Sequence, residues 1–198
     1  MAIHLHYLCA TGSSVPQGTM RHASQDKAGI FLVAANPLLR EALARALRAE
    51  IEFNVVGAYA PDADTEKAVL SSGASVVLLN DFDAARPDLT LLRKLMTAAA
   101  SLKVILVGMP ETERVFLDSI RAGAIGYVLR DASASVVVSS VRAILNGEAV
   151  CPAQMIVCAY KYFPGSGIAS PSFTHENKHA AYVANAEPRA LHFFAYSS

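Results

Sequence analysis

Several features of common protein classes are missing from this chain of 198 residues. It has no tryptophan, and aromatic residues make up only 8% of it. Its three cysteines, Cys9, Cys151 and Cys158, are odd in number and show no CxxC or Cys/His spacing. This pattern argues against a disulfide framework and against a zinc site. We therefore expect a protein that folds in a reducing compartment, the cytoplasm, and that uses no metal or cofactor.

An excess of charge of either sign is also missing. Lys plus Arg and Asp plus Glu number 17 each, so the chain lacks the long-range positive field that attracts nucleic acid or an anionic membrane. No apolar run reaches the roughly 18 residues of a membrane span, and His4 and His6 interrupt the region where a signal peptide needs an apolar stretch. We expect no membrane segment and no export, and any DNA contact would be local.

Hydrophobic residues, by contrast, are abundant at 53%, and they follow a pattern. Short runs rich in Val, Ile and Leu predict buried strands at 30–34, 53–59, 76–79, 104–107 and 126–129. Amphipathic segments predict helices between them, from Asn36 to near Glu50 and then at 64–72, 89–100, 111–122 and 133–146. The alternation predicts a doubly wound α/β fold, with five parallel strands in the order 2-1-3-4-5 and helices on both faces.

The composition changes at both ends of this pattern. The N-terminal segment mixes Gly, Ser, Pro and His without periodicity, and Met20 is an alternative start. After Pro152 the periodicity fades and Gly and Pro accumulate. We therefore predict one domain at 29–150, a disordered tail at 1–28, and a linker with a degenerate, disordered tail at 151–198.

Two segments carry a family resemblance. Residues 31–41, Phe-Leu-Val-Ala-Ala-Asn-Pro-Leu-Leu-Arg-Glu, resemble the opening of receiver domains in response regulators of the LuxR/NarL/FixJ type. Residues 120–133, Ile-Arg-Ala-Gly-Ala-Ile-Gly-Tyr-Val-Leu-Arg-Asp-Ala-Ser, are similar to the fifth-strand signature of the same family. The resemblance covers residues 30–152 in register. It implies a flavodoxin-like, CheY-like receiver domain of a two-component system, which takes part in phosphorelay signal transduction.

The resemblance also implies where a phosphorylation pocket would lie, and there this chain departs from the family. Ala34 and Ala35 replace the acidic pair after the first strand, and Asn80 replaces the phosphoacceptor aspartate. Gly108 replaces the Thr or Ser that ends the fourth strand, and Arg130 replaces the Lys after the fifth. All five positions have lost the side chain that the family chemistry uses.

These replacements predict a pseudo-receiver that is not an enzyme. Mg²⁺ requires hard oxygen ligands, and Ala34 and Ala35 offer only backbone atoms. Asn80 is uncharged and a poor nucleophile, so it cannot form an acyl phosphate. Gly108 has no hydroxyl to bond a phosphoryl oxygen, so the conformational response to phosphorylation is also predicted to be missing.

Some positions leave alternatives open. Arg130 either attracts an anion to the strand-end crevice, or reaches solvent or pairs with a nearby acid. Asp81, Asp83 and Asp88 are alternative phosphoacceptors, although each would lack both metal and hydroxyl. Tyr127 either serves as the family's switch aromatic, which rotates inward on activation, or is a half-buried aromatic at a strand edge.

The leading hypothesis for function is a signalling module that binds a protein partner, or itself, through the fourth helix, fifth strand and fifth helix. The family places a helix-turn-helix after the receiver, but only 46 residues follow Pro152 and Pro188 falls where helix would be needed. We expect that module to be missing or truncated and the chain not to bind specific DNA. The alternative is a LuxR-type transcriptional regulator with a degenerate DNA-binding region. An enzyme or nucleotide-binding protein is disfavoured because segment 34–37 has no Gly-rich phosphate cradle.

Overall fold

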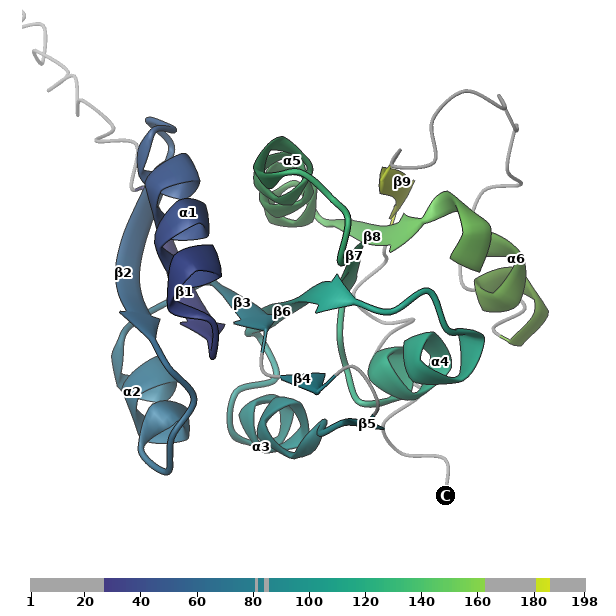
Figure 1. Ribbon diagram of the computed structural model, residues 1–198, viewed down its shortest axis with the longest axis horizontal. Helices are drawn as coiled ribbons and strands as arrows, with labels where there is room; N and C mark the ends of the chain where they lie inside the picture. The colour runs from purple at the N-terminus through teal and green to yellow at the C-terminus, as the bar shows by residue number, and fades with distance from the viewer. Residues whose placement is uncertain (1–26, 81, 84–85, 163–180, 186–198) are drawn as a thin grey trace, which may run out of the picture.

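The computed structural model describes residues 27–80, 82–83, 86–162 and 181–185. Their main feature is one sheet with helices on both faces (Figure 1). Its strands run in the order β2-β1-β3-β6-β7-β8-β9, with bounds β1 (Ala28–Ala34), β2 (Phe53–Tyr59), β3 (Val76–Asn80), β6 (Lys103–Met109), β7 (Gly126–Leu129), β8 (Glu148–Pro152) and β9 (Ala181–Asn185). A separate antiparallel pair is formed by β4 (Phe82–Asp83) and β5 (Arg86–Pro87).

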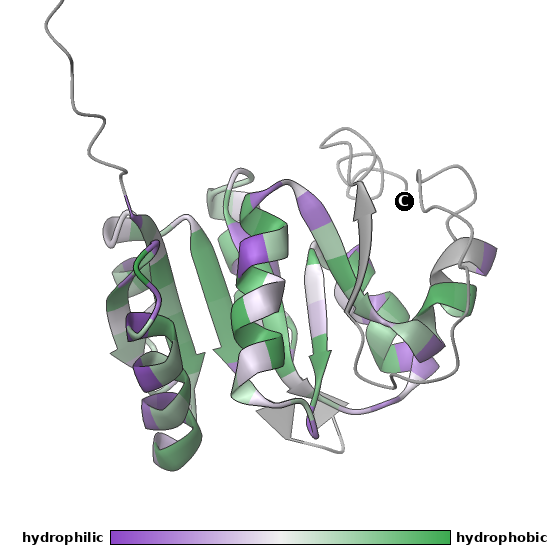
Figure 2. Ribbon diagram, turned by 90° about the horizontal axis from the view of Figure 1, so that it is seen from above, coloured by the Kyte–Doolittle hydropathy of each residue, from purple (hydrophilic) through white to green (hydrophobic). Residues whose placement is uncertain are grey.

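The predicted sheet is confirmed. The first five strands of the order β2-β1-β3-β6-β7 are all parallel and correspond to 2-1-3-4-5 once the short β4–β5 pair is set aside. These strands carry mostly hydrophobic residues along their length (Figure 2). Because successive side chains point to opposite faces, one strand serves two cores: Phe31 packs on one side of the sheet and Leu32 on the other.

Six helices cover the two faces of the sheet among the described residues. The helices α1 and α5 contribute to one buried cluster, and α2, α3 and α4 contribute to the other. Their bounds are α1 (Pro37–Arg48), α2 (Thr65–Ser71), α3 (Thr90–Ala98), α4 (Glu113–Arg121), α5 (Ala134–Leu145) and α6 (Ala153–Tyr162). No helix in the described ranges combines the length and the apolar character needed to cross a membrane.

Local capping chemistry explains where α1 and α5 begin. The Asn36 side-chain oxygen accepts hydrogen bonds from the backbone N–H groups of Leu38 (2.9 Å) and Leu39 (3.2 Å), and Pro37 occupies the first helical position. Ser133 caps α5 in the same way, through the N–H of Val136. The helices predicted to begin at Asn36 and at residue 133 thus begin at these caps.

The prediction that the domain ends at 150 and that 151–198 is a disordered linker and tail is wrong for part of that range. Strand β8 runs to Pro152, α6 follows it directly, and β9 pairs with β8 in antiparallel register. The sequence analysis missed α6 because the apolar periodicity fades after Pro152, so the order of this ten-residue helix depends on packing. The predictions for 1–26, 163–180 and 186–198, including Met20, lie outside the described residues.

The face predicted to bind a partner is not open. The fourth helix, fifth strand and fifth helix of the sequence prediction are α4, β7 and α5, and β8 and α6 lie against them. In Figure 1, α6 lies beside α4 and β8 extends the sheet next to β7. This surface is therefore covered by the chain itself.

Candidate functional site

The predicted pocket residues lie where the carboxyl ends of parallel strands meet, the usual place for a site in a doubly wound sheet. Ala34 ends β1 and pairs in register with Asn80, which ends β3. The N–H of Ala35 donates to the carbonyl of Asn80 at 3.2 Å. The structure thus brings Ala34, Ala35 and Asn80 together at one edge, with Gly108 on the neighbouring strand β6.

Asn80 uses its amide to join two strands. Its Nδ2 donates a hydrogen bond of 2.6 Å to the carbonyl oxygen of Val107 on β6. An ionised carboxylate has no proton to donate and would bring its oxygen against that carbonyl oxygen. The bond therefore depends on the residue being Asn rather than Asp.

Gly108 makes room for this amide. It lies at the register shift between β6 and β7 and has φ of +79°, in the left-handed region that favours glycine. A Cβ at this position would overlap the side-chain nitrogen of Asn80. The two replacements are therefore coupled, because the Asn80 amide occupies the space into which a Thr or Ser at 108 would project.

Arg40 is a pocket residue that the sequence analysis missed. From the first turns of α1, its Nη1 donates to the carbonyl oxygen of Ala34 at 2.5 Å, and the residue is half-buried. A cation near a helix N-terminus is opposed by the helix dipole, so its position in the sequence was a usable signal. The guanidinium places positive charge at the end of β1, next to the position of the family's acidic pair.

The residues present do not fit Mg²⁺. Ala34 and Ala35 offer no carboxylate, and Arg40 brings a positive charge to the same strand end. Among the described residues, no three His, Cys, Asp or Glu side chains gather in a way that could hold a metal ion. The arrangement lacks the hard oxygen ligands that Mg²⁺ demands.

Tyr127 is fully buried, at 1% exposure, and not half-buried at a strand edge. Its hydroxyl donates to the carbonyl oxygen of Pro110 at 2.7 Å. Its ring meets Phe116 of α4 edge to face, with centroids 5.2 Å apart. Burial raises the pKa of the Tyr127 hydroxyl, so it stays protonated and keeps its role as donor. The ring is thus held inward by contacts with α4 and with the segment that follows β6.

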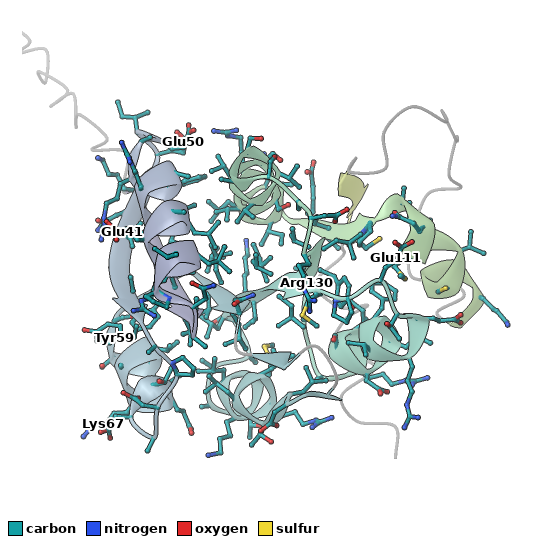
Figure 3. All side chains as sticks on the ribbon, in the orientation of Figure 1. Glu41, Glu50, Tyr59, Lys67, Glu111 and Arg130 are labelled. Carbon is teal, nitrogen blue, oxygen red and sulfur yellow. The ribbon has the colours of Figure 1, made fainter. Side chains whose placement is uncertain are left out.

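Arg130 lies at the end of β7 and is exposed, with its backbone N–H bonded to the carbonyl of Met109 at 3.0 Å. Figure 3 places it in the middle of the view, whereas Glu41 and Glu50 lie toward the outer side near α1. At the start of α3, hydrogen bonds from the side chain of Thr90 and from its backbone N–H lower the pKa of Asp88.

Of the other alternative phosphoacceptors, Asp81 and the side chain of Asp83 lie outside the described part of the chain. Asp88 is hydrogen-bonded at the start of α3. Of these three residues, Asp88 is therefore the one whose side chain the structure describes, and its carboxylate is used to bond the start of α3.

The curated proteins that this chain resembles in sequence are regulatory proteins. No protein-family model matches the chain. It is 25% identical over 127 residues to an uncharacterized transcriptional regulatory protein, YxjL, of Bacillus subtilis (strain 168), across 64% of this chain and 58% of that protein. It is 21% identical over 126 residues to a nitrate/nitrite response regulator protein homolog of Haemophilus influenzae, across 64% of this chain and 61% of the relative. The match thus spans less than two thirds of either curated relative.

Solved structures show the same fold. A LuxR-family two-component response regulator from Aurantimonas sp. SI85-9A1 superposes with a TM-score of 0.60 at 20% identity, covering 69% of this chain and 97% of that one. The isolated receiver domain of RcsB from Salmonella enterica serovar Typhimurium, with phosphomimetic BeF3-, gives 0.57 at 16%, covering 67% and 98%. The receiver domain of the putative response regulator NarL from Mycobacterium tuberculosis gives 0.55 at 23%, covering 62% and 98%.

These likenesses define the class of the fold. Residues that form the parallel sheet and its helices have the CheY-like fold of response-regulator receiver domains. The names of the curated relatives and of the structural neighbours together support a receiver domain of the LuxR/NarL type.

Proposed function

We propose that this chain is a receiver-like module of a two-component system, of the LuxR/NarL type, that acts in the cytoplasm without being phosphorylated and without enzymatic activity. The observation that carries the proposal is the 2.6 Å hydrogen bond from Asn80 Nδ2 to the Val107 carbonyl. A phosphoacceptor must present a free carboxylate oxygen to the phosphoryl group. Here the equivalent side chain is neutral, and its amide is used to hold β3 against β6.

The charge at the pocket supports the same proposal. Phosphoryl transfer to a carboxylate needs a divalent cation that neutralises the phosphoryl oxygens. Arg40, bonded to the Ala34 carbonyl, provides a cation that is part of the chain. A guanidinium donates hydrogen bonds but has no coordination sites, so it cannot hold a phosphoryl group against a carboxylate as a metal ion does.

The loss of both ends of the switch leaves no change of state that phosphorylation could drive. A ligand shifts a population only through contacts that differ between two states. Gly108 offers no hydroxyl, and Tyr127 is already buried and bonded to the Pro110 carbonyl. Binding of a protein partner, or of a second copy, at the α4, β7 and α5 face requires β8 and α6 to move aside. This binding is therefore expected to be insensitive to a phosphodonor.

The direct experiment is incubation of the full chain with acetyl phosphate and Mg²⁺, read by intact mass. We expect no added phosphate and no Mg²⁺-dependent rise in melting temperature, because a ligand stabilises a fold only when it binds the native state. Asn80→Asp restores the nucleophile alone, and it too should stay unmodified because the metal ligands are absent. Phosphate on the native chain would refute the proposal.

A second candidate is a transcriptional regulator, which the printed name of the Bacillus subtilis relative favours. Neutral net charge argues against it, since DNA affinity depends on phosphate neutralisation by Lys and Arg. A gel-shift titration of the full chain and of a version ending at residue 162 decides between the two. A sequence-specific shift that is lost on truncation would establish DNA binding and favour the transcriptional regulator.

A further inference from the structure

The segment that follows α5 packs against α4, β7 and α5 of the receiver-like fold. Strand β8 contacts β7 and α5, and α6 starts directly after β8 and contacts α4. Along α6, Met155 and Ile156 are 4% and 2% exposed, whereas Val157 is 58% exposed. The helix therefore directs one apolar side inward and leaves the other side to solvent.

The buried side of α6 packs toward α4. Met155 belongs to the same buried cluster as Phe116 and Leu117 of α4 and Tyr127 of β7. Cys158 packs against this cluster, and burial together with the neighbouring Glu113 carboxylate raises the pKa of its thiol. The inner side of α6 thus covers the same part of the surface that holds Tyr127 inward.

The backbone connection of this segment to the rest of the sheet is small. A single ladder pair, Gly126 with Val150, joins β7 to β8, whereas five pairs join β8 to β9. Gly147, just before β8, has φ of +87° and no heavy atom within 4 Å of the position a Cβ would take. Segments with few backbone ties to the core open at lower free energy than the core itself.

We propose that β8 and α6 form a displaceable cap, the β8–α6 cap, which occupies the α4–β7–α5 face and opens as one unit about Gly147. A protein partner would then reach this face only in the open state. Opening breaks the ladder pair and the bond from the Val150 N–H to the Ile125 carbonyl, and it withdraws the buried side chains of Val150, Met155 and Ile156. The five parallel strands stay paired. Strand β9 pairs with β8 at the end of the sheet, so it moves with the cap. The proposal concerns the fold and holds whether or not the pocket takes phosphate.

The test uses Cys151, a half-buried thiol on β8 whose burial raises its pKa to about 12. Alkylation of the full chain by N-ethylmaleimide under native conditions, followed by peptide mass spectrometry, measures Cys151 separately from Cys9 and Cys158. Hydrogen exchange of the β3 amides, measured in parallel, reports global unfolding. If the cap opens as proposed, the opening free energy calculated from the rate of Cys151 alkylation should be lower than the opening free energy calculated from exchange of the β3 amides.

Two variants on the same helix sharpen the test. Met155→Ser removes a buried apolar side chain and should accelerate Cys151 alkylation at least about tenfold relative to β3 exchange. Val157→Ser changes an exposed position of α6 and should leave the rate unchanged. If Cys151 reacts only at the rate set by global unfolding, in the native chain and in Met155→Ser alike, β8 and α6 are an integral part of the cooperative fold and the cap does not exist. Equal acceleration by both variants would also overturn the proposal. Neither readout uses a phosphodonor, so a failure of the cap proposal can be told apart from a failure of the phosphorylation test.

Discussion

Replacing Asn80 by Asp exchanges one NH₂ group for an oxygen at the point where β3 is joined to β6. The native amide donates to the Val107 carbonyl at 2.6 Å. The ionised carboxylate cannot donate, and it leaves two acceptors facing each other. An unsatisfied group of this kind costs about 1–3 kcal/mol of stability. Because Asn80 is half-buried, solvent screens part of the penalty, and we expect about 1–2 kcal/mol at neutral pH.

The same substitution should make stability depend on pH, with a definite sign. When it is protonated, the introduced aspartate can still donate to Val107, so the folded state favours the protonated form and raises the carboxyl pKa above its unfolded value of about 3.9. Below that unfolded pKa, the variant should be nearly as stable as the native chain. The loss should appear as pH rises from about 4 and level off above the raised folded pKa, about one unit higher for each 1.4 kcal/mol of penalty.

Urea denaturation followed by circular dichroism, at a series of pH values between about 4 and 8, measures this difference. Asn54→Asp is the matched control, since Asn54 is exposed on the edge strand β2 and the same chemical change there should have little effect at any pH. A pH-independent loss in Asn80→Asp, or a loss equal to that of Asn54→Asp, would show that the amide bond to Val107 does not hold the strand ends together.

Two further substitutions test the neighbouring contacts. Gly108→Ala forces a side chain into the left-handed region, which costs about 1–2 kcal/mol, and adds the overlap with Asn80. Gly73 has a similar φ of +69°, and no heavy atom lies within 4 Å of the position its Cβ would take, so Gly73→Ala measures backbone strain alone. In the same urea titration, Gly108→Ala should lower the free energy of unfolding more than Gly73→Ala does. Tyr127→Phe should lower the free energy of unfolding by about 1 kcal/mol, because the hydrogen bond from the Tyr127 hydroxyl is lost while the ring packing is kept. The Pro110 carbonyl keeps its second donor, the N–H of Thr112. An unchanged unfolding curve for Tyr127→Phe would contradict the assignment of that bond.

The five parallel strands and their helices could be predicted because their signals are local. Fully apolar runs such as 76–79 identify strands that are buried on both faces, and Asn36 with Pro37 marks the start of α1 without reference to the rest of the chain. The position of the pocket followed as well, since strand ends in a parallel sheet meet at one edge. The sequence by itself therefore determined the fold and the place of Ala34 and Asn80 in it.

What those residues do there was decided only by the tertiary structure. The bond from Asn80 joins it to a carbonyl 27 residues away, and Arg40 reaches back across the first turns of α1 to Ala34. Neither contact leaves a periodic signal. The Asn80 bond depends on two strands that the sheet brings together, and the Arg40 bond depends on the rotamer that the side chain takes at the start of α1. The same reason explains why β8 and α6 were missed. One ladder pair to β7 and the packing of Met155 under α4 give them order, and both exist only once the sheet has formed.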